Sequence, residues 1–220
     1  MFLIVSPILL TLLLSSSATA QDLQQERIIK IETSFGDMVV KLYNETPLHR
    51  DNMIKLISEG FYKDQLFHRI IKGFMIQGGD PNSVGAEKGQ RLGAGGPGYT
   101  IPAEFNPKLI HKKGALAAAR EGDATNPERA SSGSQFYLVQ GRVLTQEEID
   151  ILRQRGVANI SEESAEVYKT IGGTPHLDGA YTVFGEVIEG LDVLNAIASV
   201  PTDAYNRPVD DVIYSISIIK

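Results

Sequence analysis

Residues 67–80 read FHRIIKGFMIQGGD and bring four functional side chains close together in the sequence. Arg69 and Gln77 offer hydrogen-bond donors, Phe74 and Met75 offer a large apolar surface, and Gly73 permits a bend between them. No nucleophile, general-base pair or metal-ligand set accompanies them. This combination is typical of a site that lowers a barrier by polarising a group in an apolar cleft, without cleaving a bond. Taken alone, the stretch also fits an exposed arginine on an ordinary strand.

Two further blocks place this stretch in a context. Residues 133–138 read GSQFYL, and residues 177–187 read LDGAYTVFGEV. All three blocks resemble signature segments of the cyclophilin family of peptidyl-prolyl cis-trans isomerases, and they occur in the same order as in that family. The resemblance runs from about Ile28 to Lys220 and implies one isomerase domain over residues 28–220.

The alternation of apolar and polar residues predicts a mainly β protein. Residues 28–33 and 38–43 flank a short turn and predict a β-hairpin, and residues 212–219 predict a closing strand. Helices are predicted from Pro47 to Gly60 and over residues 191–198. Many short strands with glycine-rich turns favour a closed barrel, which leaves no sheet edge exposed. The resemblance sharpens this expectation to a closed eight-stranded antiparallel β-barrel capped by two helices.

Residues 142–174 depart from the short pattern of the family and predict an inserted helical hairpin. Thr145 and Glu148 form a capping box before an apolar stripe that Gly156 ends. Ser161 opens a second helical segment, which ends at Gly172. The simplest role of the hairpin is an elaboration of the surface. Because both of its ends adjoin cleft residues in the sequence, a lid or docking element is the alternative.

The first 20 residues carry no charged side chain and predict a signal peptide. An apolar run over residues 2–14 is followed by Ala18-Thr19-Ala20, which matches a signal-peptidase site. The run is shorter than the roughly 20 residues that span a bilayer, so no stable membrane insertion is expected after cleavage. Residues 21–27 form a polar linker. The pattern predicts export to the periplasm of a Gram-negative bacterium or secretion; a buried N-terminal helix is the alternative.

Charge and composition argue against several classes of function. The 220 residues carry a formal net charge of -6, which does not favour a nucleic-acid surface. Without cysteine, neither disulfides nor thiolate metal sites can form, and the four histidines lack metal-ligand spacing. Residues 93–98 match the pattern GxGxxG, but no strand leads into them, so they predict a glycine-rich surface loop beside the cleft. We therefore expect no metal and no cofactor.

The resemblance implies catalytic roles for Arg69 and Gln77. Rotation of an X-Pro bond crosses a barrier of roughly 18–20 kcal/mol, because amide resonance must be broken. At the top of the barrier the prolyl nitrogen regains a basic lone pair. A guanidinium aimed at this nitrogen stabilises the transition state more than either ground state. Arg69 matches the arginine of the family motif, and Gln77 matches the amide nearest the rotating carbonyl.

An apolar pocket for the proline ring is the second feature that the resemblance implies. Phe74, Met75, Tyr137 and Leu177 match the pocket positions of the family. On composition alone each of these residues is expected in a hydrophobic core, so their assignment rests on the resemblance. Tyr137 stands where the best-known eukaryotic members carry phenylalanine, which predicts an additional hydroxyl at the pocket.

Five further residues are implied to contact the substrate. Gln135 matches a second amide that holds the substrate backbone, and Ala119 with Arg120 matches a segment whose backbone pairs with the substrate as an added strand. His176 and Tyr181 fall where the best-known eukaryotic members carry tryptophan and histidine, respectively. Because isomerisation moves no proton, we interpret His176 as a wall residue rather than as a general base.

The sequence as a whole predicts a peptidyl-prolyl cis-trans isomerase that acts as a monomer on proline-containing unfolded or extended polypeptides. Its expected role is the folding of exported proteins. Two alternatives use the same chain differently. One is a non-catalytic proline-binding or holdase chaperone module, which has no need of Arg69. The other is an interaction protein that works through the inserted hairpin, residues 142–174.

Overall fold

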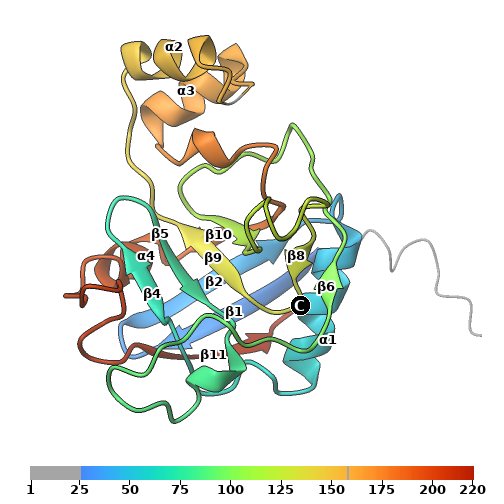
Figure 1. The fold of residues 1–220 in the computed structure, drawn as a ribbon, viewed down its shortest axis with the longest axis vertical. Coiled ribbons are helices and arrows are strands. Elements are labelled where there is room, and N and C mark those ends of the chain that lie inside the picture. Colours follow the sequence, from blue (N-terminus) through green and yellow to red (C-terminus); the bar gives the residue numbers. More distant parts are fainter. Residues whose placement is uncertain (1–25, 158) are drawn as a thin grey trace, which may run out of the picture.

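The computed structural model describes residues 26–157 and 159–220, and its architecture is mainly β (Figure 1). Nine strands form one sheet in the order β3-β11-β1-β2-β10-β7-β9-β5-β4, and β6 pairs separately with β8. The predicted signal peptide, residues 1–20, lies outside the described residues. The strands are β1 (Arg27–Thr33), β2 (Gly36–Leu42), β3 (Gln65–Leu66), β4 (Arg69–Ile71), β5 (Met75–Gly78), β6 (Thr100–Ile101), β7 (Ala115–Ala118), β8 (Ser131–Ser132), β9 (Phe136–Val139), β10 (Val183–Glu189) and β11 (Ile213–Ile218).

The sheet curls into a half-barrel, and the predicted closure into eight strands is not seen among the described residues. Its two edge strands, β3 and β4, are separated only by Phe67 and His68, so they are successive parts of one segment rather than facing neighbours. The loop that follows the last helix binds this segment instead. The N–H of Phe67 donates to the carbonyl of Val212 at 3.0 Å, and that of Ile70 to the carbonyl of Asn206 at 2.8 Å. The edges are therefore satisfied without a closed barrel.

Four α-helices occur in the described part of the chain: α1 (Pro47–Ser58), α2 (Gln146–Gln154), α3 (Glu162–Thr170) and α4 (Leu191–Ile197). The positions of α1 and α4 agree with the sequence, and the two helices lie at opposite ends of the curled sheet (Figure 1). Leu56 of α1 and Leu194 of α4 belong to one large core together with Phe136 of β9. Within the described residues, no helix combines the length and the apolar character that crossing a bilayer requires.

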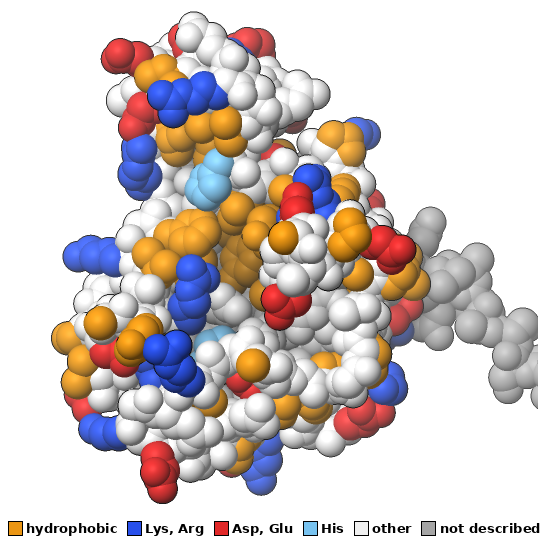
Figure 2. All heavy atoms as spheres, in the orientation of Figure 1, with side chains coloured by type: hydrophobic (Ala, Val, Ile, Leu, Met, Phe, Trp, Pro, Cys, Tyr) orange, Lys and Arg blue, Asp and Glu red, His pale blue; other side chains and the backbone are white. Residues whose placement is uncertain are grey.

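A second, smaller apolar cluster lies on the other face of strands β5, β7 and β9. Met75, Tyr137 and Val139 are buried in it, and Leu177 and Tyr181 pack against it while staying partly exposed. Figure 2 shows hydrophobic side chains gathered in the middle of one face of the molecule, beside the side chain of a lysine or arginine. Both faces of these central strands are thus covered by apolar groups, which explains why β7 and β9 read as continuous apolar runs.

The predicted helical hairpin is present as α2 and α3, which stand away from the sheet at the top of Figure 1. The capping box of Thr145 and Glu148 forms as predicted, and Ser161 caps α3. The two ends of the hairpin meet where Gly141 and Gly173 touch. A Cβ on Gly141 would collide with the Cα of Gly173. The chain therefore leaves the main body and returns to it at the same point, and the hairpin is an insertion between these two glycines.

This crossing predicts a stability difference between two glycine substitutions. Gly141 has φ +58°, and Gly60 has φ +72° with no atom within 4 Å of the place that a Cβ would take. Gly60→Ala should lower the free energy of unfolding by about 1 kcal/mol through backbone strain alone. Gly141→Ala should lower it by about 3 kcal/mol, because the methyl group also collides with Gly173. Urea denaturation of both variants measures the difference, and equal losses would contradict the close approach.

Candidate active site

The register of four strands aligns the predicted catalytic residues. Arg69 of β4 lies opposite Gln77 of β5, Gln77 lies opposite Tyr137 of β9, and Tyr137 lies opposite Ala117 of β7. Residues directly opposite each other in an antiparallel sheet point to the same face. In the adjacent row, Met75 lies opposite Val139. The local pattern of alternation thus places a cation, an amide and an aromatic ring side by side on one surface.

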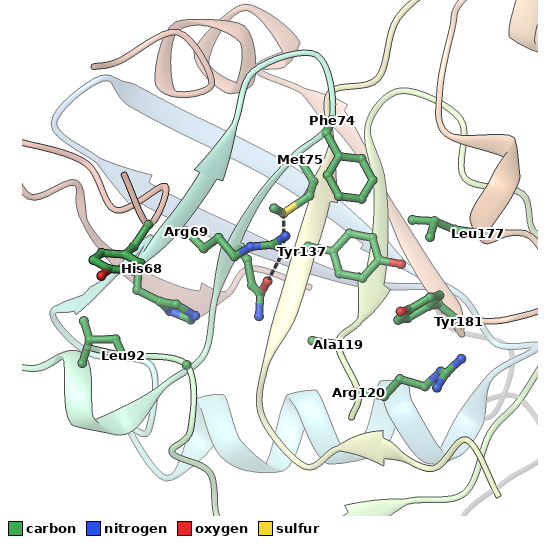
Figure 3. Close-up of a pocket in the computed structure, with 13 residues that line it drawn as sticks. His68, Arg69, Phe74, Met75, Leu92, Ala119, Arg120, Tyr137, Leu177 and Tyr181 are labelled. Atoms are coloured by element: carbon green, nitrogen blue, oxygen red, sulfur yellow. Dashed lines mark hydrogen bonds between the residues drawn. The ribbon is translucent and has the colours of Figure 1, made fainter. Parts of the chain in front are cut away.

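A hollow of about 420 Å³ lies over this row. Figure 3 shows Arg69 reaching into it toward the ring of Tyr137, with Leu177, Tyr181 and Arg120 on the wall opposite His68 and Leu92. Nine of the eleven predicted site residues line the hollow, namely Arg69, Phe74, Met75, Gln77, Ala119, Arg120, Tyr137, Leu177 and Tyr181.

The remaining two predicted residues, Gln135 and His176, lie in adjoining hollows. Gln135 lines a second hollow, formed with the glycine-rich loop of residues 93–98, and accepts a hydrogen bond from Gln77 at 3.1 Å. His176 stacks on Phe74 with ring centroids 5.7 Å apart and lines a third hollow beside the helical hairpin. Burial lowers the pKa of the His176 ring, which favours its neutral form.

A chain of hydrogen bonds orients the polar groups of the site. Arg69 Nη1 donates to Gln77 Oε1 at 3.1 Å, and Gln77 Nε2 donates to Gln135 Oε1. Gln135 Nε2 then donates to the carbonyl groups of Gly93 and Gly95. Throughout the described ranges, no carboxylate lies within ion-pair distance of Arg69. Burial lowers the pKa of the Arg69 guanidinium, but an arginine remains charged at any accessible pH.

The main chain beside the pocket corrects one prediction. The N–H of Ala119 donates to the carbonyl of Gln135, and its carbonyl accepts from the N–H of Ser132. Ala119 is therefore already paired within the protein and has no free N–H for an added strand. The main chain of Arg120 makes no such backbone pair among the described residues. The backbone of Arg120 is thus the part of this segment that remains available for pairing, and its guanidinium lies 4.5 Å from the centroid of the Tyr181 ring.

The hydroxyl of Tyr137, expected as an additional polar group at the pocket, is engaged by the buried His111. It lies 3.0 Å from His111 Nε2, and His111 Nδ1 lies 2.8 Å from Asp178 Oδ1. The hydroxyl of Tyr168, on α3 of the hairpin, donates to Asp178 Oδ2. The carboxylate of Asp178 can only accept a hydrogen bond, so His111 Nδ1 carries the proton and donates it to Asp178. His111 Nε2 is then the acceptor for the hydroxyl of Tyr137. This buried network holds the pocket ring and connects it to the inserted hairpin.

Comparison with known proteins agrees with this geometry. The family model described as cyclophilin type peptidyl-prolyl cis-trans isomerase/CLD matches residues 28–218. The chain belongs to the cyclophilin family. The match, the relatives and the solved neighbours together show that it is a cyclophilin-type peptidyl-prolyl cis-trans isomerase.

Two relatives illustrate the similarity. A Staphylococcus haemolyticus protein named as a peptidyl-prolyl cis-trans isomerase is 35% identical over 195 residues, which cover 88% of this chain and 91% of that protein. A Streptococcus pyogenes protein named as a bifunctional phosphatase/peptidyl-prolyl cis-trans isomerase is 38% identical over 188 residues. That alignment covers 84% of this chain but only 37% of the longer protein.

A solved structure shows the same fold. The cyclophilin type isomerase cgd2_1660 of Cryptosporidium parvum superposes with a TM-score of 0.64 at 28% identity. The alignment covers 89% of this chain and 99% of that one. The same protein in the presence of the dipeptide Ala-Pro gives a TM-score of 0.63.

Four residues that line the central hollow of this cyclophilin were not predicted as site residues: His68, Leu92, Tyr205 and Gly93 of the glycine-rich loop. His68 adjoins Arg69 in the sequence, so the motif itself contained a signal for it. Leu92 and Tyr205 come from loops distant in the sequence, and no local pattern marks them. His68 is buried, and neither ring nitrogen has a hydrogen-bond partner among the described residues. Burial is the main cause that lowers the pKa of His68 to about 4.

The low pKa of His68 predicts an acid-sensitive stability. A histidine in the unfolded chain has a pKa of about 6.5. As the pH falls from about 6.5 to about 4, this histidine binds a proton in the unfolded state but stays neutral in the folded state. The folded state therefore loses stability over this pH range. The loss from this group is at most about 3 kcal/mol. Urea unfolding at pH 7 and 4.5 should show a smaller difference for His68→Gln than for the wild type; equal differences would contradict the assignment.

Proposed function

We propose that this cyclophilin accelerates rotation of X-Pro bonds by placing the guanidinium of Arg69 at the prolyl nitrogen. The proline ring enters the apolar pocket between Phe74, Met75, Tyr137 and Leu177. As the bond twists, the nitrogen loses conjugation and gains electron density, which a donor of fixed charge stabilises. No proton is transferred and no bond is broken in this step.

One observation carries the proposal: the charge of Arg69 is not neutralised by any carboxylate in the described part of the chain, although its side chain is half-buried beside the apolar residues Phe74 and Met75. A charge in such a site interacts more strongly with a polarised group than it would in water. The hydrogen bond to Gln77 holds Nη1 and leaves the other donors of the guanidinium for a ligand. Gln77 is also placed to hold the carbonyl of residue X.

The magnitude that this mechanism requires is modest. A thousandfold acceleration corresponds to about 4 kcal/mol of differential stabilisation. Loss of one preorganised donor from a catalytic site removes roughly 100-fold to 1,000-fold of rate. One charged hydrogen bond in a half-buried site, with orientation by the amides, therefore supplies the required order of magnitude.

The substrates we propose are extended, proline-containing segments of unfolded polypeptides. The free main chain of Arg120 supports this choice, because an extended segment can pair with it as an added strand. The same proposal includes action as a monomer and a role in folding exported proteins. Export is supported by the apolar run over residues 2–14 and by Ala18-Thr19-Ala20.

Substitution of Arg69 tests the mechanism. Arg69→Ala should lower kcat/KM for a short X-Pro peptide by about 100-fold or more, measured by a protease-coupled assay or by exchange NMR. The urea transition should move little, because Arg69 lies outside the large core. Arg27→Ala in β1 is the matched control and should retain full activity. Near-normal turnover by a well-folded Arg69→Ala protein would refute the role of the guanidinium.

The export proposal has its own test. When the full chain is produced in a bacterium, we expect a mature protein that begins at Gln21 in the exported fraction, because Ala18-Thr19-Ala20 directs cleavage. Mass spectrometry of the purified protein reads the N-terminus directly. Replacing Ala18 and Ala20 by lysine should leave the precursor uncleaved. An intact N-terminus on the wild-type protein would contradict the proposal.

A further inference from the structure

A hollow of about 490 Å³ lies between the inserted hairpin and the turn that joins β4 to β5. Ile71 and Phe74 form its floor on the side of the sheet, and Ile151 and Leu152 of α2 form the opposite wall. Figure 2 shows hydrophobic side chains on both sides of a histidine where the upper lobe meets the body of the molecule. The inserted hairpin therefore adds a second apolar cavity to the surface that carries the catalytic pocket.

The two cavities share a wall. Phe74 lines both of them, and its ring stacks on His176 with centroids 5.7 Å apart. A polypeptide that places a proline ring against one side of Phe74 can therefore continue directly past His176 into the hollow below α2. One polypeptide can therefore occupy both cavities at once.

The polarity of the bound chain determines which part of it reaches this hollow. Gln77 is the amide proposed to hold the carbonyl of residue X, and it lines both the central hollow and the one beside the glycine-rich loop. Residue X and the residues before it therefore lie toward that loop. The chain that follows the proline leaves on the other side, toward Phe74 and His176. This step rests on the function proposed above for Arg69 and Gln77.

The residues that line the hollow below α2 determine which kind of side chain it can bind. Ile151 is 38% exposed, whereas Ile149 on the other side of α2 is fully buried in the core of the hairpin. Ile151 is thus not required to hold the hairpin together. At the rim, Arg142 Nη1 donates to Glu148 Oε2 at 2.9 Å, so the two charges compensate each other. An apolar cavity with a neutralised rim favours a neutral, apolar side chain over an acidic or basic one.

We propose that this hollow is a subsite for an apolar side chain located a few residues after the proline of the client polypeptide. The inserted hairpin then contributes to substrate selection instead of merely elaborating the surface. A client with leucine, isoleucine, methionine or phenylalanine in this region binds more tightly than one with serine. A peptide that ends directly after the proline does not engage the subsite.

The test compares two peptides on the protein from Gln21 to Lys220. Both are fluorescein-labelled decapeptides with one central Ala-Pro bond, and they differ only in carrying leucine or serine at the second, third and fourth positions after the proline. Fluorescence anisotropy measures Kd without requiring turnover. The wild type should bind the leucine peptide about 5-fold to 10-fold more tightly than the serine peptide.

Two matched variants assign this preference to the hollow. Ile151→Glu places a charge in its wall and should abolish the preference for leucine. Ile188→Glu introduces the same change at an isoleucine of β10 that is 45% exposed and lines none of the three hollows described above. It should keep the preference. Turnover of a tetrapeptide that ends soon after the proline should be unchanged in both variants.

The outcomes separate the subsite from the catalytic mechanism. Equal binding of both peptides by the wild type, or a full preference for leucine in Ile151→Glu, would overturn the subsite. A leucine preference that persists while Arg69→Ala retains normal turnover would refute the catalytic proposal and leave the subsite in place. The peptide comparison on the wild type does not depend on whether any variant folds.

Discussion

The register of β4, β5, β9 and β7 is the constraint on which the site depends. Ile70, Ile76 and Leu138, which alternate with the site residues, have at most 1% of their surface exposed and belong to the large core. A shift of pairing by one residue would exchange the two faces, so that Arg69 would enter the core. Each of these apolar side chains stabilises the correct register by roughly 1.5–3 kcal/mol. The large core thus determines where the site residues lie, although Arg69 and Gln77 are not part of it.

A second constraint comes from a carboxylate rather than from the core. Asp178 accepts from the main chain of His111, from the His111 ring and from the hydroxyl of Tyr168. The ring of His111 in turn fixes Tyr137, the floor of the pocket. Buried polar groups of this kind are costly when a partner is missing, at about 1–3 kcal/mol each. The hairpin that carries Tyr168 is therefore connected to the pocket through hydrogen bonds, and this connection fits a hairpin that takes part in substrate binding.

The sequence predicted elements whose signals are local. The capping box at Thr145 and Glu148 marks the start of α2, and the motif around Arg69 contained five of the thirteen residues that line the hollow. The features of the site that the sequence did not predict depend on contacts between residues distant in the sequence. The main chain of Ala119 is used by a strand distant in the sequence, and Tyr205 reaches the hollow from the loop before β11. No periodicity or turn preference encodes such contacts, because they depend on how separate segments meet.

The chemistry of the site also explains why its cation is an arginine. Burial in the apolar hollow lowers the pKa of the cation, and the same burial strengthens its effect on a polarised ligand. A lysine starts from a pKa of about 10.4, so burial brings it closer to losing its proton, whereas an arginine starts above about 12. The planar guanidinium donates to Gln77 at 3.1 Å and has further N–H donors besides the one used there. A lysine ammonium offers no such fixed geometry, so an arginine suits a half-buried position that needs a permanent, oriented charge better than a lysine does.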